Sequence, residues 1–351
     1  MDATNYRIEK GTTKNGTTKY FLVKDIKVGK KIARERRYIK SGDPPTAEEL
    51  QKFSKENAME IEVEALNRAA SLSCSRYIAR YLSKEEISVV ESIRYLYKAF
   101  TNTLTTNELK KYEKDFEISY VSGTTSIEGN TLSLKETYDL LVNDIIPSEK
   151  SAREINEVQN FKRVLAYRDK YHGRITIKFI KNLHGIIVSN IDDESAGSFR
   201  RSDFIGINGC DLRVTPYFEI EEELRSAIDD YYNNIKNGGY PFEEAILFHY
   251  RFEMIHPFID GNGRVGRELL NYLLIRNRPP YPKLLFLGKD RPTYIKALKL
   301  GNEEKYKEMV NFFVDLIIKQ RLEVLRKNFE RAMEAQTRPR GQLKLTDFVI
   351  I

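Results

Sequence analysis

The spacing of hydrophobic residues divides the chain into a short N-terminal part with strand periodicity and a long remainder with helical periodicity. Short stretches of alternating apolar residues, bounded by turn signals such as Asn15-Gly16, predict strands near 6–9, 20–23 and 32–39. From residue 46 onward, apolar residues recur at the three- and four-residue spacing of amphipathic helices. The pattern therefore predicts a mainly α-helical protein with a small α+β module at its N-terminus.

Helix-start signals locate several of the predicted helices. Ser133 with Glu136 and Ser151 with Glu154 form capping boxes, and Pro241 suits the first position of a helix. After two or three helices within 46–101, we expect helices at 134–143, 152–171, 176–190, 219–236, 242–254, 264–276, 291–300 and 303–335. Residues 198–216 alternate instead and are predicted to form a β-hairpin.

Composition narrows the class of protein. The 351 residues are 41% hydrophobic and 31% charged, which suits a folded chain of two or three domains and excludes intrinsic disorder. No apolar run reaches the ~18 residues that cross a bilayer, and the first residues lack a signal-peptide pattern. The two cysteines have neither metal-ligand spacing nor the number needed for a disulfide framework. We expect a reduced cytoplasmic protein that does not act at membranes.

The net charge of +7 belongs to one end of the chain. Residues 1–40 hold twelve Lys or Arg and four Asp or Glu, whereas the rest of the chain is close to neutral. The basic cluster, with Tyr20 and Tyr38 interleaved, consists of Lys24, Lys27, Lys30, Lys31, Arg34, Arg36, Arg37 and Lys40. This cluster predicts DNA as a possible partner through phosphate contacts. A solvated basic face or a docking surface for an acidic protein remains the alternative.

The stretch 256–267 carries the clearest chemistry. Gly261-Asn262-Gly263 precedes a predicted helix, and such a turn directs backbone N–H groups at an anion where the helix dipole favours negative charge. Arg264 and Arg267 are three residues apart, so both project from one face of the first helical turn. The arrangement suits the binding of several phosphate oxygens.

Two further residues of this stretch supply reactive groups. Asp260 offers a hard carboxylate ligand for Mg²⁺ that bridges phosphates, and His256 can accept a proton near neutral pH. A base, a metal ligand and a phosphate site in one loop are the parts required for in-line attack on a nucleotide phosphate.

The pattern His-Pro-Phe-x-Asp-Gly-Asn-Gly-Arg-x-x-Arg resembles the full signature of the Fic (filamentation induced by cAMP) family, over about residues 105–315. The resemblance implies a Fic-type helical bundle that transfers AMP from ATP to a Ser, Thr or Tyr hydroxyl of another protein. It implies that His256 deprotonates the hydroxyl, Asp260 binds Mg²⁺, Gly261–Gly263 bind the α- and β-phosphates, and Arg264 and Arg267 hold the β/γ end. The related Doc branch has Lys at the position of Gly263, so glycine favours adenylyl transfer over phosphoryl transfer.

A second motif lies upstream, at 124–129. Thr124 and Glu128 are spaced to share a helix face, and Gly129 after them is a helix stop. A carboxylate at a helix C-terminus is disfavoured by the dipole unless a cation faces it; a solvated Glu is the alternative. The motif resembles the inhibitory helix of Fic proteins, which implies that Glu128 pairs with Arg267 and blocks the γ-phosphate. In some relatives this Glu positions a water that removes AMP, so a de-adenylylase is a second possibility.

The predicted hairpin 198–216 resembles the family's flap, which pairs with the backbone of the target protein. By the same resemblance Ile205 and Gly206 lie nearest the nucleotide, and Tyr294 and Asn302 occupy places where relatives contact adenosine. The alternatives are an ordinary hairpin and, for Tyr294, a ring in the core. Two other histidines, His184 and His249, are predicted to be structural.

The expected organisation is a basic β-rich module at 1–45, a helical connection at 46–104, a Fic core at 105–315 and a C-terminal helix and tail at 316–351. The expected function is an autoinhibited, Mg²⁺-dependent protein adenylyltransferase that uses ATP, with a homodimer as a further possibility. A DNA-binding regulator that uses the Fic core as a nucleotide sensor is the alternative from a different class.

Overall fold

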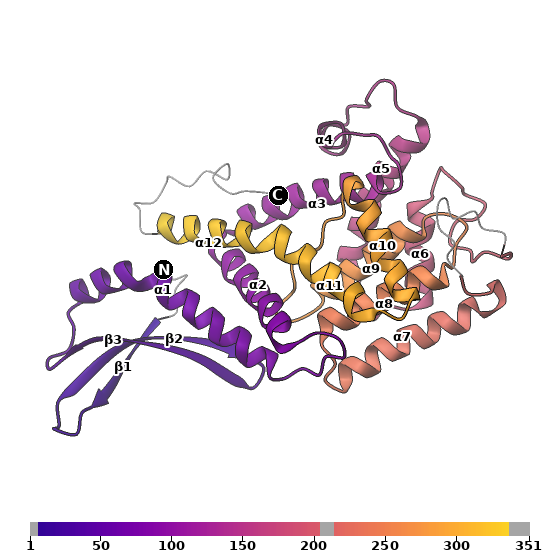
Figure 1. Ribbon diagram of the computed structural model, residues 1–351. Coiled ribbons are helices and arrows are strands. Elements are labelled where there is room, and N and C mark those ends of the chain that lie inside the picture. The colour runs from indigo at the N-terminus through magenta and orange to yellow at the C-terminus, as the bar shows by residue number, and fades with distance from the viewer. Residues whose placement is uncertain (1–5, 204–213, 337–351) are drawn as a thin grey trace. The chain divides into compact units, whose positions relative to one another are not determined.

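The computed structural model describes residues 6–203 and 214–336 (Figure 1). The chain divides into two compact units. The first contains residues up to 77, residues 83–110 and residues from 317 onward, and the second contains 78–82 and 111–316. Both are dominated by helices, and the only strands within the described ranges lie near the N-terminus, which confirms the predicted fold class.

The first unit contains an antiparallel sheet in the order β1 (Tyr6–Thr12), β2 (Thr18–Val28) and β3 (Lys31–Ser41). The long helix α1 (Ala47–Cys74) packs on one face of β2 and β3 and begins with a capping box at Thr46. Figure 1 shows this helix above the sheet. The alternation of strand residues therefore places one set of side chains against α1 and the other set on the opposite face.

The rest of the first unit is helical. Helix α2 (Lys84–Thr103) packs against α12 (Glu323–Gln336). The sequence predicts one helix over 303–335, but the structure has α11 (Tyr306–Ile317), a π-helical segment at Ile318–Leu322 and then α12. The π segment inserts an extra residue per turn, which shifts the apolar face between the two helices.

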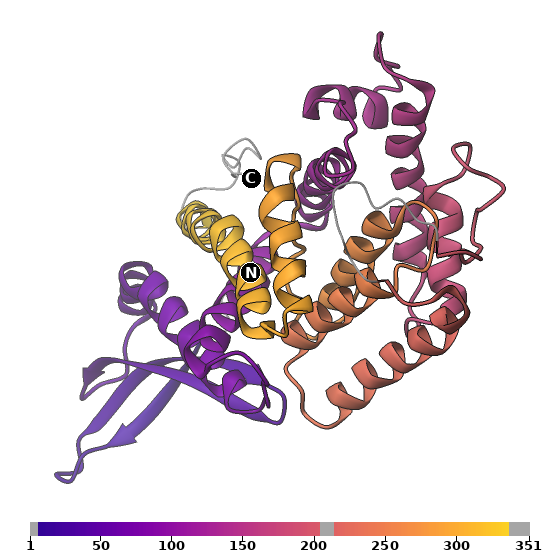
Figure 2. The ribbon, with the colours of Figure 1, turned by 45° about the vertical axis from the view of Figure 1, so that its right-hand side comes forward.

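The second unit is a helical bundle, seen from a second direction in Figure 2. Besides α11, its helices are α3 (Thr106–Ser126, from residue 111 on), α4 (Leu134–Val142), α5 (Ala152–Lys170), α6 (Ile177–Ile187), α7 (Ile220–Lys236), α8 (Pro241–Ile255), α9 (Asn262–Ile275) and α10 (Arg291–Asn302). Helix α9 packs on both α8 and α6, and nearly all of its residues are buried. The loop between α8 and α9 is thereby fixed at both ends to the centre of the bundle.

Several predicted boundaries differ from the structure by a few residues, such as 176–190 for α6. Helix α9 begins at Asn262 instead of residue 264, because Gly261 takes a left-handed conformation with φ of 79° immediately before it. The hairpin predicted at 198–216 lies mostly outside the described residues, since these omit 204–213; the described ends, 198–203 and 214–216, contain no strand. No helix in the described ranges is both long and apolar enough to cross a membrane.

Candidate active site

The loop from His256 to Gly261 joins the two central helices of the second unit. Helix α8 ends at Ile255, and its C-cap His256 has φ of 49° and ψ of 60°, a left-handed conformation uncommon for a residue with a side chain. The chain then turns through Pro257 and Phe258 and enters α9 at Gly261. Positive φ at both ends makes this turn tight, and it leaves the backbone N–H groups at the start of α9 free of helical partners.

Two side chains brace the loop from inside. The amide of Asn262 accepts from the N–H of Phe258 (2.9 Å) and donates to its carbonyl (2.8 Å). The ring of His184, on α6, stacks on Phe258 with centroids 3.7 Å apart. Because the Asn262 side chain is buried and bonded to the backbone of Phe258, its backbone N–H is the group that it offers to a ligand.

His184 also fixes the loop through hydrogen bonds. Its Nδ1 accepts from the N–H of Gly197 (3.0 Å), so Nε2 carries the proton and donates to the carbonyl of Asp260 (3.1 Å). Burial lowers the pKa of His184 to about 4, so the ring remains neutral in this role. The prediction that His184 is structural agrees with these contacts.

His256 is oriented as a base. Its Nδ1 lies 3.3 Å from the carbonyl oxygen of Glu253, which favours the proton on Nδ1 and leaves Nε2 free to accept. Burial lowers the pKa of His256, and the positive charge of Arg200 lowers it further. The imidazole is therefore neutral near pH 7, as a general base must be.

Arg200 holds the backbone around His256. It is 3% exposed and donates from Nε to the carbonyl of His256 (2.9 Å) and from Nη2 to the carbonyls of Ile255 (3.4 Å) and Thr215. Its Nη1 donates to Asp203 (2.7 Å). One guanidinium thus ties both described ends of the segment around 204–213 to the catalytic loop.

Asp260 lies among cations. Its carboxylate accepts from Nη2 of Arg264 (2.9 Å), from Arg153 on α5 and from the N–H of Gly261 (2.6 Å). Burial would raise the pKa of Asp260, but Arg264 and the other donors outweigh it and hold that pKa below its usual value. Its side chain is 38% exposed, so an ionised oxygen donor faces the opening of the site.

This environment fits Mg²⁺ bound together with phosphates. The described residues contain no cluster of three or more His, Cys, Asp or Glu that could enclose a metal by themselves. Mg²⁺ commonly uses one or two carboxylates and completes its shell with waters and substrate phosphates. Asp260 is the residue that would hold it.

Arg267 is buried and bonded to the upstream motif. It has no exposed surface, its Nε and Nη2 donate to the hydroxyl and the carbonyl of Thr124 (2.9 Å each), and Nη2 also donates to Oε1 of Glu128 (2.7 Å). Burial would raise the pKa of Glu128, but Arg267 and then Arg264 lower it below its usual value. Glu128 is therefore ionised and neutralises Arg267.

The carboxylate of Glu128 also covers the start of α9. A methyl group added to Gly263 would lie 2.4 Å from Oε1 of Glu128 and 2.9 Å from Nη1 of Arg267. Glycine is required there because the carboxylate approaches the backbone so closely. The anion site predicted from the glycine-rich turn is thus occupied by an anionic side chain of the same chain.

The helix prediction for this motif is wrong in one detail. Helix α3 ends at Ser126, and Glu128 lies in the following turn, where its N–H donates to the carbonyl of Thr125 (3.0 Å). The backbone here forms hydrogen bonds from residue i to residue i−3, as in a 3₁₀ turn, before Gly129, which has φ of 99°. Thr124 and Glu128 nevertheless converge on one arginine.

A buried polar cluster lies behind Arg267. The hydroxyl of Tyr294 is 2.8 Å from Nε2 of His249, and Nδ1 of His249 is 3.9 Å from Oε1 of Glu253. Three atoms here, His249 Nδ1, Glu253 Oε1 and Arg267 Nη1, have no hydrogen-bond partner among the described residues. Burial raises the pKa of Glu253 to about 8. A second carboxyl group therefore lies close to Arg267, largely in its neutral form.

The remaining predicted positions are less directly placed. Tyr294 is 2% exposed beneath Arg267, and Asn302 is exposed and accepts from the hydroxyl of Tyr250 (2.8 Å). Ile205 and Gly206 lie outside the described residues. Contact of these four with a nucleotide stays a prediction.

Sequence reasoning missed the three residues that support the site: Arg153, Arg200 and Glu253. Each lies on or beside a segment for which the sequence predicted a different role or no role in the site. Only Arg200, directly before the predicted flap, had a position that could have drawn attention to it. The contacts of the other two depend on tertiary packing that no local pattern records.

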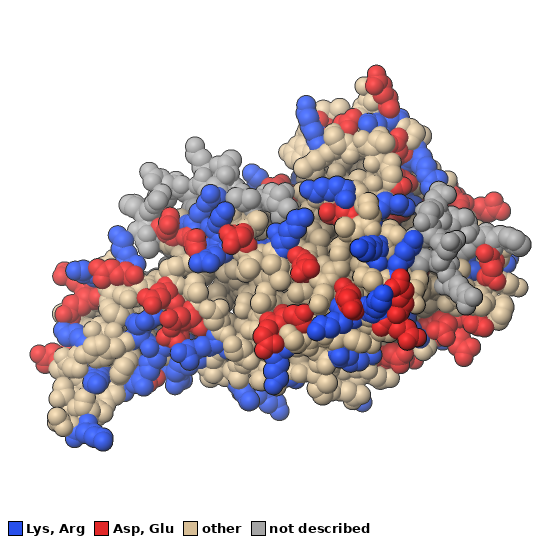
Figure 3. All heavy atoms as spheres, viewed as in Figure 1, with Lys and Arg blue, Asp and Glu red and all other residues tan. Residues whose placement is uncertain are grey.

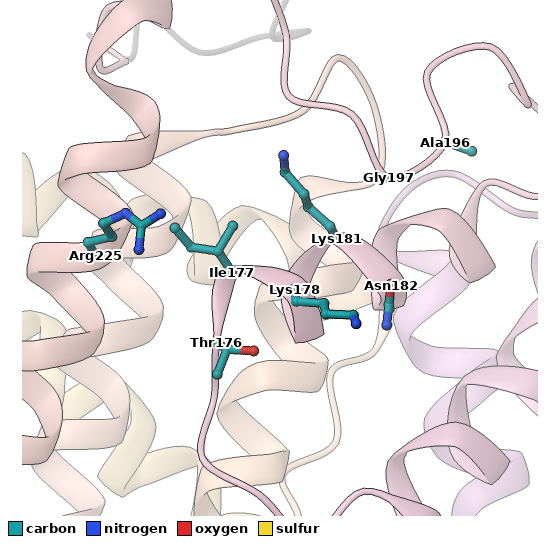
Figure 4. A pocket seen from close by; sticks show the side chains of 8 residues that line it. All are labelled: Thr176, Ile177, Lys178, Lys181, Asn182, Ala196, Gly197 and Arg225. Atoms are coloured by element: carbon teal, nitrogen blue, oxygen red, sulfur yellow. The ribbon is translucent and has the colours of Figure 1, made fainter.

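A separate open cavity of about 650 Å³ lies at the start of α6. Figure 4 shows its lining, which includes Lys178, Lys181 and Arg225 and none of the residues from 256 to 267. The three cationic side chains point in different directions, so they do not form one anion site. The candidate active site is therefore the α8–α9 loop.

Comparison with known proteins agrees with this placement. Residues 174–274, all within the second unit, match the model of the Fic/DOC family. The chain is similar to protein adenylyltransferase Fic of Drosophila willistoni (32% identical over 211 residues, 59% of this chain and 41% of the relative). It is also similar to protein adenylyltransferase fic-1 of Caenorhabditis elegans (30% over 222 residues, 61% and 42%). The chain spans about two fifths of the length of these curated relatives.

Solved structures confirm the Fic-type bundle. Fic-1 from C. elegans superposes with a TM-score of 0.59 at 24% identity, over 84% of this chain and 89% of the other. A Fic domain containing signalling protein from Bacteroides thetaiotaomicron superposes with a TM-score of 0.58 at 23% identity, over 71% and 99%. Both comparisons concern the fold.

Proposed function

We propose that this chain is a protein adenylyltransferase that transfers AMP from ATP to a Ser, Thr or Tyr hydroxyl of a protein. One observation carries the proposal. The braced loop and the first turns of α9 bring together a neutral imidazole, backbone N–H groups without helical partners and two buried arginines. Relatives at about 30% identity that are named protein adenylyltransferase support it.

In the proposed reaction the target oxygen attacks the α-phosphorus of ATP. Nε2 of His256 accepts the hydroxyl proton, a P–O bond forms to the target, and the bond from the α-phosphorus to the bridging oxygen breaks as pyrophosphate leaves. The N–H groups at Gly261–Gly263 stabilise the charge that develops on the α- and β-phosphates. Arg264 and Arg267 neutralise the departing end.

Asp260 would hold Mg²⁺, which neutralises phosphate charge when bound. To do so, Asp260 exchanges part of its present bonding to arginine for the metal, because it now accepts from both Arg153 and Arg264. Arg153 is the more exposed partner, with 57% of its side chain accessible, and is the one expected to withdraw.

The same proposal includes autoinhibition by Glu128. The carboxylate takes up a hydrogen bond of Arg267 and lies over Gly263, where a phosphate of ATP would have to be accommodated. Its side chain remains 31% exposed, so it can be displaced without opening the core. ATP bound beside it would lack its contact to Arg267 and lie out of line for attack.

The partner and location follow the same reasoning. We propose that the target protein binds beside the flap at 198–216, since Arg200 fixes the base of that segment to the backbone of His256. Cytoplasmic location and a homodimer stay predictions from the sequence and the family resemblance.

Auto-adenylylation with ATP labelled on the α-phosphorus tests the proposal. Wild type, Glu128→Gly and Glu128→Gly/His256→Ala are compared in the presence of Mg²⁺. Strong labelling only in the single variant is expected. If no form labels itself or lysate proteins although ATP binds, the transferase proposal fails under these conditions. Release of AMP from a labelled protein by wild type but not by Glu128→Gly would favour the de-adenylylase instead.

A further inference from the structure

The structure sorts the positive charge of the N-terminal sheet between its two faces. Three cations on the face toward α1 are paired with acidic residues of that helix. These pairs are Lys24–Glu62 (2.7 Å), Arg37–Glu60 (3.0 Å), Arg37–Glu64 (3.3 Å) and Lys40–Glu49 (2.8 Å). These ion pairs link α1 to the sheet, so the charge of their cations is not available to a partner.

The opposite face, here called the outer face, keeps its own set of cations. The two-residue period and the strand register place on it Arg7 from β1, Lys19 and Lys27 from β2, and Arg34 and Arg36 from β3. Two acids share this face, Glu9 and Asp25. The outer face therefore has a net charge of +3 from these seven residues.

The two acids hold the three arginines in fixed positions. Glu9 and Asp25 lie between them, in pairs that are Arg7–Glu9 (3.0 Å), Arg7–Asp25 (3.1 Å), Arg34–Asp25 (2.8 Å), Arg34–Glu9 (3.6 Å) and Arg36–Glu9 (3.0 Å). The arginine side chains are nevertheless 41–47% exposed. Each guanidinium thus keeps N–H donors that point to solvent from an ordered base.

Aromatic and apolar groups complete a flat surface. The guanidinium of Arg36 lies 3.8 Å from the ring centroid of Phe21, and that ring meets Tyr38 edge-on at 5.8 Å. Val23, between Arg7 and Arg36 in the register, is fully buried beneath these side chains. Tyr38 is 47% exposed. In Figure 3 blue side chains follow the lower border of this sheet, whereas red ones lie above it toward α1.

We propose that the outer face of this sheet binds the major groove of duplex DNA. Three strands span about 10 Å between the outer backbones, which matches the ~12 Å width of that groove. Forked guanidinium donors on a rigid sheet suit the N7 and O6 acceptors of guanine and the phosphate oxygens beside them. Lys14 and Lys30, in the turns at opposite ends of the sheet, would contact the two phosphate backbones.

An acidic protein is the competing partner, and the arrangement favours DNA over it. Cations lie on all three strands of this face. Exposed large apolar groups, which would supply the centre of a protein interface, are limited on the described part of this face to Ile32 and Tyr38. A DNA duplex has regularly spaced phosphates and can therefore contact cations over the whole face. This inference is independent of the proposed transferase activity.

The test is fluorescence anisotropy of a labelled mixed-sequence duplex a few helical turns long, titrated with the full chain between about 50 and about 200 mM salt. Three double variants are compared with wild type. Arg34→Gln/Arg36→Gln removes two arginines of the face, and Lys19→Gln/Lys27→Gln removes two cations of the face that leave no acid unpaired. Lys52→Gln/Lys55→Gln removes the same charge from the exposed side of α1.

The proposal expects wild type to bind with an affinity that falls steeply with salt. Both face variants should lose roughly tenfold or more in affinity and reduce the salt slope by about 2, while the α1 variant binds like wild type. Equal losses in all three variants, or no duplex binding by wild type at the lowest salt, would overturn it. Binding of poly-glutamate but not of duplex would assign the face to an acidic protein. Circular dichroism and thermal unfolding of each variant show that the variants are folded.

Discussion

Both the α8–α9 loop and the outer face of the N-terminal sheet organise arginines with carboxylates, but they do so in opposite environments. Arg267 has no exposed surface, and its partner Glu128 comes from a segment more than a hundred residues away. Arg34 and Arg36 lie on the surface and pair with acids of neighbouring strands. A buried arginine cannot be left unpaired without a large cost, whereas exposed pairs contribute about 0–1 kcal/mol each.

The difference shows what each set of arginines is suited to do. Because Arg267 needs an anion at all times, whichever anion binds it determines the state of the site. Glu128 and a phosphate group therefore compete for one position. The surface arginines need no partner, so they can exchange carboxylates for an external polyanion with little penalty. The site at the α8–α9 loop is therefore suited to act as a switch, and the outer face of the sheet is suited to act as a contact surface.

The largest effect is expected from removing the base. In the Glu128→Gly background, His256→Ala should reduce auto-adenylylation by about 10²- to 10⁴-fold, because no other described group with a free acceptor is fixed in this position. His184→Gln, which alters a side chain that braces the same loop from α6, is the comparison. It should reduce the rate less and lower the melting temperature more. Retained labelling in His256→Ala would remove His256 from the reaction.

Relief of the switch should give the next largest effect. Replacing Glu128 by Gly should raise auto-adenylylation on the order of tenfold to a hundredfold, since it frees Arg267 and the N-terminus of α9 for phosphate. Glu149→Gly, which removes an exposed carboxylate at a position with φ of 68°, serves as the matched control. Equal activation by both changes would contradict a specific role for Glu128.

Arg153 should set how readily Asp260 accepts a metal. Arg153→Gln is expected to strengthen Mg²⁺ binding to the ADP-bound protein a few-fold in calorimetry, because one of the two cations on Asp260 is removed. Arg163→Gln, farther along α5, is the control and should leave the titration unchanged. Weaker Mg²⁺ binding in Arg153→Gln would mean that Arg153 orients Asp260 instead of competing with the metal.

The buried carboxyl of Glu253 should make stability depend on pH. Its folded-state pKa of about 8 lies above the ordinary value of 4.5, so the folded protein holds a proton that the unfolded chain releases between these values. Its stabilising contribution is present below pH 4.5 and is lost as pH rises to about 8. Glu253→Gln, which cannot ionise, should therefore lose less stability than wild type between about pH 5 and about pH 8 in urea unfolding.

The exposed Glu222 on α7 supplies the control for that measurement. Glu222→Gln should follow the wild-type pH profile. A Glu253→Gln profile that also follows wild type would show that Glu253 is ionised in the folded protein.

The smallest effect is expected on the outer face. Arg34→Gln and Arg36→Gln should each change the free energy of unfolding no more than substitutions of other exposed residues do, because exposed ion pairs contribute little. Chemical unfolding at two salt concentrations checks this. A loss several times larger would show that the arginines stabilise the sheet and that, like Arg267, they need their carboxylate partners.

Much of the fold and the centre of the site could be predicted from the sequence because local physics determines them. Capping boxes, as at Ser133 and Ser151, and the turn at Asn15-Gly16 depend on a few adjacent residues, and the structure contains both caps and the turn. The 256–267 stretch carries most of its chemistry in twelve consecutive residues. Its recognition required no tertiary information.

What could not be predicted depends on packing between distant segments. Nothing local to Arg153 indicates that it contacts Asp260, and nothing local to Glu253 indicates that its carboxyl lies against Gly266 beneath Arg267. The pattern also could not show which cations of residues 6–41 are paired with acids of α1, because that depends on how the helix packs on the sheet. A count of charged residues alone therefore overstates the positive charge that is available to a partner.

The central claim, adenylyl transfer at a site closed by Glu128, is tested most directly by the position of the label. Glu128→Gly is incubated with ATP labelled on either the α- or the γ-phosphorus, and protein-bound label is measured with and without His256→Ala. We expect incorporation of label from the α-phosphorus only, and we expect this incorporation to disappear when His256 is replaced by Ala. Incorporation from the γ-label would contradict it, since it would mean that the nucleotide binds in the reverse direction and the chain transfers phosphate.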